Sequence, residues 1–358
     1  MVRSPSRSTF LQQPRLLKKR ALQAVPVIAL FPFLMFGFRM IDSHFIRIAA
    51  AVVACLVIFG IVLVVAVRLR NLKLFAGMIL ILPIYFCMCV AVSDFSYFDA
   101  KTMMTSFSKS LAPGSEFLLG TDYEGRDILS TIVIGGMNAY LVAAIATFIA
   151  LVFGVPTGLL LSRDGVFLKQ VASVFTQFFE IVPQLFFVLI VLGVFNFWAA
   201  ASASTRLVAS YAVPMAGFAI GISSLPAMAR VVENRVNQLK SRRFVTALKS
   251  SNIGSGKILF YNILWKNSLS EIIVQATFLF GATILVESAL GYAFEIGFGE
   301  LGTGGYLSWG KILAEARRSI LFVENLWIVA SPIFVTIMSI LGVNIIGDSL
   351  AGILRGES

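Results

Sequence analysis

Residues 137–161 read MNAYLVAAIATFIALVFGVPTGLLL and contain no charged side chain. Because an α-helix rises about 1.5 Å per residue, this stretch is long enough to cross the roughly 30 Å of hydrocarbon in a bilayer. The whole chain of 358 residues is 58% hydrophobic and 13% charged, whereas a soluble domain averages about 25% charged residues. The sequence therefore predicts an all-α polytopic membrane protein.

Seven other apolar runs accompany this one. The predicted spans are 21–38, 48–67, 74–93, 137–161, 171–197, 207–229, 270–290 and 326–347. The first follows a basic head, as in a signal peptide, but its apolar run continues to Phe38 without a small-residue cleavage site. We interpret it as a retained first helix, which makes about eight spans in all.

The net charge of +11 is concentrated in alternate loops. Lys and Arg cluster in the head and in the connections after the second, fourth and sixth spans, whereas 94–136 and 291–325 are acidic or mixed. Since cytoplasmic loops carry the excess of Lys and Arg, both termini are predicted to be cytoplasmic. The same cations predict contact with anionic lipid and argue against nucleic acid.

Few residues could hold a metal or catalyse a reaction. The three cysteines lie inside apolar runs, and the single histidine, His44, lies in a short loop. Residues 254–257 read GSGK, like the end of a phosphate-binding loop, but Ser251 stands where that motif needs glycine and Ile258 where it needs Ser or Thr. We predict no catalytic residue, no metal site and no cofactor bound by this chain.

A long basic segment, 230–269, separates the sixth and seventh spans, where a simple bundle needs only a short connection. Within it, apolar residues recur on both sides of a polar stretch that includes Asn252 and Gly254. The pattern predicts two short helices joined by a turn. A short amphipathic helix at this place either lies on lipid or inserts into a groove of a soluble partner.

Five motifs carry a resemblance to a known family. Residues 119–130 read LGTDYEGRDILS, followed by EIVP at 180–183, ILVESAL at 284–290, SWG at 308–310 and NIIGDSL at 344–350. The first closely resembles the LGTD-x-x-GRD-x-LS signature of the dipeptide/oligopeptide/nickel family of ABC importer permeases, and the others resemble that family's later motifs in the same order. The resemblance covers about residues 119–350.

The resemblance implies a type I ABC importer transmembrane fold in a bacterial inner membrane, translocating short peptides or a related small solute by alternating access. The implied partners are a second, related permease subunit, two ATPases that bind ATP and Mg, and an extracytoplasmic substrate-binding protein. The basic segment would then be the coupling helix that docks on an ATPase. Its family motif E-A-A-x-x-x-G reads TALKSSN at 246–252, so a glutamate contact is lost, although asparagine can still adopt the left-handed turn of glycine.

The predicted organisation has five parts. They are a basic cytoplasmic tail (1–20), a three-span segment (21–93), a periplasmic loop with the GTD–GRD signature (94–136), a core permease domain with coupling segment 240–265 (137–350), and a cytoplasmic tail (351–358).

The candidate site residues fall into three groups. The ATPase-coupling group is Phe244, Val245, Thr246, Ala247, Leu248, Asn252 and Ile258. The periplasmic signature is Gly120, Thr121, Asp122, Gly125, Arg126 and Asp127, which either forms a local ion-pair and capping cluster or contacts the binding protein. The candidate pathway residues are Glu180, Pro183 and Glu287, with a structural hydrogen bond as the alternative role for each glutamate.

Two other functions are compatible with the composition. One is a secondary transporter or channel, although the halves show no clear internal repeat. The other is a membrane scaffold that transports nothing, which the altered coupling motif suggests.

The prolines at 156, 183, 226 and 332 are expected to kink spans or to free backbone carbonyls.

Overall fold

The computed structural model describes residues 60, 72–93, 110–163, 165–201, 205–243, 245, 258–294, 307–316 and 325–356. Every regular element in them is helical. In chain order these are α3 (Leu72–Ser93), α5 (Ile128–Leu161), α6 (Val166–Ile181), α7 (Gln184–Ala201), α8 (Thr205–Lys240), the π-helix η2 (Ile258–Trp265), α11 (Leu269–Phe294), α12 (Trp309–Ala316) and α13 (Leu326–Arg355). An isolated antiparallel bridge joins Thr121 to Asp127. The all-α prediction is confirmed for these residues.

Four described helices are long and apolar enough to cross a membrane. They are residues 128–161, 211–240, 269–293 and 326–355, and α6 with α7 adds a fifth if the bent pair counts as one span. The predicted span 74–93 coincides with α3, whereas 21–38 and 48–67 lie outside the described residues apart from Gly60.

Several predicted boundaries were wrong. Helix α5 begins at Ile128 instead of 137, α8 continues past 229 to Lys240, and α13 continues past 347 to Arg355, into the predicted cytoplasmic tail. Hydropathy marks where a helix can contact hydrocarbon, but a helix ends only where its backbone is capped. Asp127 caps the start of α5, and Gly356, in the left-handed conformation, caps the end of α13.

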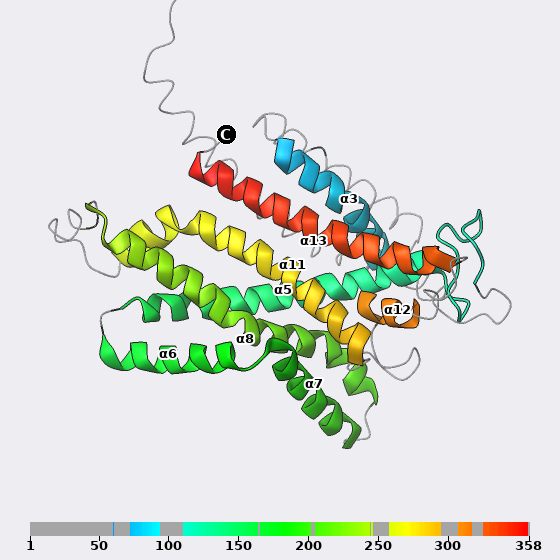
Figure 1. The fold of residues 1–358 in the computed structure, drawn as a ribbon, viewed down its shortest axis with the longest axis horizontal. Coiled ribbons are helices and arrows are strands. Elements are labelled where there is room, and N and C mark those ends of the chain that lie inside the picture. The colour runs from blue at the N-terminus through cyan, green and yellow to red at the C-terminus, as the bar shows by residue number, and fades with distance from the viewer. Residues whose placement is uncertain are drawn as a thin grey trace, which may run out of the picture.

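The long helices form one bundle (Figure 1). Helix α5 packs along α8, α11 packs along α13, and α3 covers the outer side of α13. A core of small and branched residues, including Val142, Ala146, Ala216 and Ile220, joins α5 and α8 to α7 and α11. Helix α12 packs on α11 near the end of the bundle at which α5 begins.

Two glycine pairs bring α5 and α8 into close contact. Gly154 and Gly158 lie one turn apart on α5, and Gly217 and Gly221 do so on α8. A Cβ atom added at Gly158 would lie 2.4 Å from the Ala229 carbonyl oxygen, and one at Gly221 would lie 2.9 Å from the Ala146 carbonyl oxygen. Close approach of small residues is a common way for membrane helices to associate, because lipid offers no hydrophobic drive between them.

The predicted span 171–197 is broken. Helices α6 and α7 meet at an angle of 92° across Val182 and Pro183. Val182 is extended, as a residue before proline prefers, and its N–H closes the last turn of α6 on the Phe178 carbonyl. The prolines at 156, 214, 226 and 332 all lie inside continuous helices, so among the four prolines singled out in the sequence only Pro183 coincides with a break.

Candidate functional site

The loop before α5 is built around the Asp122 carboxylate. One of its oxygens accepts hydrogen bonds from the backbone N–H groups of Glu124 and Arg126, both at 2.9 Å. Its other oxygen lies 2.6 Å from Arg126 Nε, and the Arg126 side chain is only 3% exposed. A second contact, 3.2 Å long, joins Arg126 to Glu124. The ion pair expected from the signature is therefore present.

Glycine and threonine complete this loop. Gly120 and Gly125 have φ angles of 77° and 83°, which favour glycine. A Cβ atom at Gly120 would lie 2.4 Å from the Leu111 carbonyl oxygen, while Thr121 Oγ1 accepts from Leu111 N at 2.8 Å. Asp127 then caps α5 by accepting from Ser130 N.

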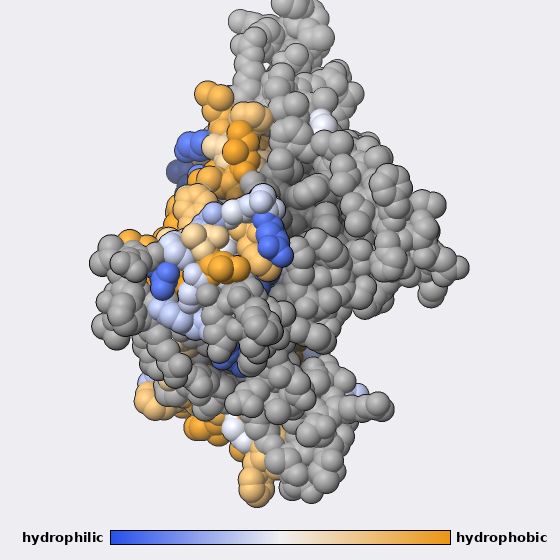
Figure 2. Space-filling view, turned by 90° about the vertical axis from the view of Figure 1, so that its right-hand side faces the viewer, coloured by the Kyte–Doolittle hydropathy of each residue, from blue (hydrophilic) through white to orange (hydrophobic). Residues whose placement is uncertain are grey.

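The end of the molecule that carries this loop has a surface of mixed polarity. Figure 2 views the molecule from the end that carries the loop and shows hydrophilic residues beside hydrophobic ones there. The geometry accounts for the signature as a self-supporting structure. Contact with a binding protein stays a prediction.

We expect Asp122→Asn to lower the free energy of unfolding by about 2 kcal/mol, because the buried Arg126 guanidinium loses its closest anionic partner. The measurement is thermal unfolding of the purified chain in detergent. Glu116, an exposed carboxylate of the same loop, provides the control, and Glu116→Gln should leave the transition unchanged. Equal transitions for both variants would contradict the assignment.

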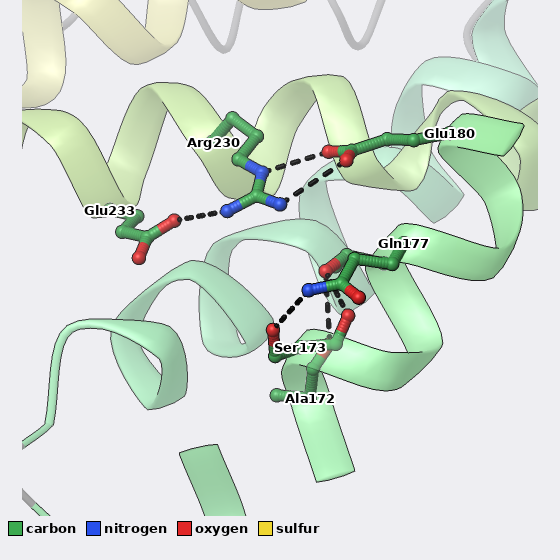
Figure 3. Close-up of polar contacts among 7 residues, drawn as sticks. Ala172, Ser173, Gln177, Glu180, Arg230 and Glu233 are labelled. Carbon is green, nitrogen blue, oxygen red and sulfur yellow. Dashed lines mark hydrogen bonds and ion pairs between the residues drawn. The ribbon is translucent and has the colours of Figure 1, made fainter. Parts of the chain in front are cut away.

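A second polar cluster lies at the elbow between α6 and α7 (Figure 3). Arg230, on α8, donates from Nε and Nη2 to the two carboxylate oxygens of Glu180, at 2.8 and 3.2 Å, and from Nη1 to Glu233 at 3.0 Å. These side chains are partly exposed. Next to the elbow, Gln184 donates to the hydroxyls of Ser223 and Ser224. The candidate pathway residue Glu180 is thus held by a polar group of α8, and Pro183 lies in the turn next to Gln184.

The elbow contact can be tested by exchanging its charges. Arg230→Glu would place three carboxylates together, so we expect a lower unfolding temperature, and the double variant Glu180→Arg/Arg230→Glu should recover most of the loss. Partly exposed ion pairs contribute only about 0–1 kcal/mol, so the change from breaking the pair alone, in Arg230→Gln, should be small. A double variant no more stable than Arg230→Glu would show that the pair does not hold α6 to α8.

Glu287 lies apart from that elbow, on α11. It is fully buried, and among the described residues neither of its carboxylate oxygens has a hydrogen-bond partner; the same holds for the hydroxyl of Ser288. The structure therefore places the three candidate pathway residues at two separate locations.

Helix α12 covers this part of α11. A Cβ atom at Gly310 would lie 1.9 Å from the Ser288 carbonyl oxygen, and one at Gly291 would lie 2.5 Å from Ser308 Oγ. Trp309 is fully buried and donates from Nε1 to the Ile132 carbonyl at 2.9 Å, which ties α12 to α5. The sequence did not predict this helix, although the SWG motif marks its start.

The coupling segment is described only at its two ends. Val245 is buried in the same apolar cluster as Ile263 and Leu264 of η2, while Ile258 begins η2. The predicted second helix of this segment is thus a π-helix. The Phe244 side chain and residues 246–248 and 252 lie outside the described residues, so the ATPase-coupling assignment stays a prediction.

Two cations make contacts close to the ends of this segment. Arg235 donates to the Asn267 carbonyl and pairs with Glu271 at 2.9 Å, and Lys240 Nζ donates to the Ser162 carbonyl. Sequence reasoning counted these residues only as topology signals. Over the described ranges, no group of three or more His, Cys, Asp or Glu side chains could hold a metal ion; the absence of a cofactor stays a prediction.

Three peptide permeases are similar in sequence to this chain over two thirds or more of their own length. The dipeptide transport system permease protein DppC of Alkalihalophilus pseudofirmus is 32% identical over 242 residues, covering 66% of this chain and 71% of the relative. The di/tripeptide permease protein DppC of Pseudomonas aeruginosa is 29% identical over 289 residues (78% and 87%), and the oligopeptide permease protein OppC of Salmonella typhimurium is 29% identical over 288 residues (79% and 86%).

No family model matches the chain. Among solved structures, the fold is similar to one chain of the inward-facing MetNI methionine ABC transporter, with a TM-score of 0.48 and 16% identity over 64% of this chain and 96% of that chain.

Proposed function

This chain belongs to the dipeptide/oligopeptide permease family of ABC importers, and from that membership we propose that it carries short peptides across the bacterial inner membrane by alternating access. The observation that carries the proposal is the 32% identity to a dipeptide permease over 71% of that relative's length. The multi-pass membrane character agrees with the four or five apolar spans among the described helices. This membership favours an ABC permease over a secondary transporter or channel.

The proposed topology has eight spans with both termini in the cytoplasm. It places the loop around Asp122 outside and the cationic contacts of Arg235 and Lys240 inside. The concentration of Lys and Arg in the connections after the second, fourth and sixth spans supports this orientation.

The proposed assembly contains a second, related permease subunit, two ATPases and an extracytoplasmic substrate-binding protein. ATP and Mg would bind to the ATPases, and this chain would convert their closure into a change of access. Because α8 leads into the coupling segment, η2 leads from it towards α11, and Arg235 of α8 pairs with Glu271 of α11, a force on the segment would act on α8 and α11. Switching access requires elements with two discrete packings, and the α6–α7 elbow and α12 are candidates.

Docking of the ATPase is tested by placing Asp at Phe244, Leu248 and Ile258 together and measuring co-purification of an ATPase subunit. We expect the ATPase to be lost, because the variant removes the apolar face of the segment. The matched control is Leu118→Asp, an exposed apolar residue of the opposite loop. Undiminished co-purification would contradict the coupling assignment, and the thermal transition of the triple variant shows whether the bundle is intact.

Peptide transport is tested with radiolabelled dipeptide in proteoliposomes that contain this chain, the second permease subunit and two ATPases, with the binding protein added. We expect uptake only with ATP and the binding protein present. Uptake that persists without ATP but requires an ion gradient would indicate a secondary transporter. A complete complex that hydrolyses ATP and transports nothing would support the scaffold alternative, which the altered motif at 246–252 keeps open.

A further inference from the structure

An aromatic face on η2 remains unexplained by the proposed transport mechanism. Phe260, Tyr261 and Trp265 are 61%, 47% and 51% exposed. On the opposite face of the same π-helix, Ile263 and Leu264 are buried in the bundle. The segment is therefore held firmly on one side while it presents three large aromatic side chains on the other.

The side chain of Lys266 adds a cation to this aromatic face. Lys266 directly follows η2, and its Nζ sits 4.7 Å from the centre of the Tyr261 ring. Tyrosine, tryptophan and lysine each combine an apolar body with a polar end. Side chains of this kind are enriched where a membrane protein passes through the headgroup layer.

The helix that follows η2 has the apolar surface expected of a segment in the hydrocarbon layer. Helix α11 begins four residues after Trp265 and exposes Val274, Phe278 and Leu285, whose spacings of four and seven residues place them on one face. Along the chain, an aromatic and cationic segment thus precedes an apolar stripe, in the order of a chain that enters hydrocarbon from the headgroups.

We propose that Phe260, Tyr261, Trp265 and Lys266 form an interfacial anchor that binds the headgroup layer of the cytoplasmic leaflet, with preference for anionic lipid. The preference follows from charge complementarity, since the Lys266 ammonium group lies on this exposed face. The anchor would hold the C-terminal end of the coupling segment at a constant depth in the membrane. The inference requires a membrane-spanning chain and does not depend on peptide as the cargo.

The first test measures the depth of Trp265 in the full chain, reconstituted alone in vesicles of phosphatidylcholine and phosphatidylglycerol. The lipids carry bromine either close to the headgroup or near the end of the acyl chain, and the fluorescence difference between the natural chain and Trp265→Phe isolates this one residue. We expect its fluorescence to be quenched most by bromine close to the headgroup. Quenching by aqueous acrylamide with none from either lipid would overturn the proposal.

The second test measures the lipid preference. We expect phosphatidylglycerol to raise the unfolding temperature of the natural chain above its value in phosphatidylcholine, and this shift to be lost in Tyr261→Ser/Trp265→Ser/Lys266→Gln. The control is Lys169→Gln, which removes one exposed cation from α6 and should reduce the shift less than the triple variant does. A triple variant with an undiminished shift would contradict the anchor, as would shielding of Trp265 from acrylamide only when ATPase subunits are added, because the face would then be a protein dock.

Discussion

Gly310→Ala is expected to lower the free energy of unfolding by about 3 kcal/mol or to prevent accumulation of the folded chain. The added methyl carbon would lie 1.9 Å from the Ser288 carbonyl oxygen and 2.6 Å from its carbon. Both atoms belong to the backbone of α11, so no side chain can rotate out of the way. Helix α12 would have to move off α11 and would pull Trp309 out of its buried site against α5.

The matched control is Gly193→Ala on α7, where an added Cβ meets nothing within 4 Å. Alanine is favoured over glycine in a helix by about 1 kcal/mol, so this variant should be neutral or slightly more stable. The two variants are compared by thermal unfolding and by the monodisperse fraction in size-exclusion chromatography. A Gly310→Ala chain that unfolds together with the natural one would show that α12 does not pack on α11 as described.

The parts of this fold that local sequence determines could be predicted. Long apolar runs identified α3, α11 and α13, because the requirement to cross hydrocarbon sets both composition and length. The cap at Asp127 and the ion pair of Asp122 with Arg126 could be predicted because their partners lie within four residues along the chain.

Contacts between distant segments could not be predicted. Glu180 and Arg230 pair across 50 residues, and Gly310 meets Ser288 only because α12 folds back on α11. A kink was expected at each of four prolines, but the sequence did not show that Pro183 would mark a 92° break, since the prolines at 156, 226 and 332 carry the same local signal and lie in continuous helices. Apolar periodicity over 258–265 indicated a helix but not the wider π-helical turn that exposes Tyr261 and Trp265.

Glu287→Lys is expected to lower the free energy of unfolding by 3 kcal/mol or more, because it places an ammonium group at a fully buried position. Glu287→Gln is expected to unfold at the same temperature as the natural chain or higher. The amide has the shape of the carboxyl group, and it carries no charge whose burial must be compensated. Exposed Glu116 again supplies the control, and Glu116→Lys should change little.

The Gln variant also tests the pathway role predicted for Glu287. A carboxylate that meets the ammonium group of a passing peptide contributes through its charge, so peptide uptake should fall about tenfold or more at unchanged stability, which corresponds to about 1.4 kcal/mol. Glu287 is sealed beneath α12 in this conformation, and such a contact requires α12 to lift during the transport cycle. Uptake equal to that of the natural chain would restrict Glu287 to supporting the contact between α11 and α12.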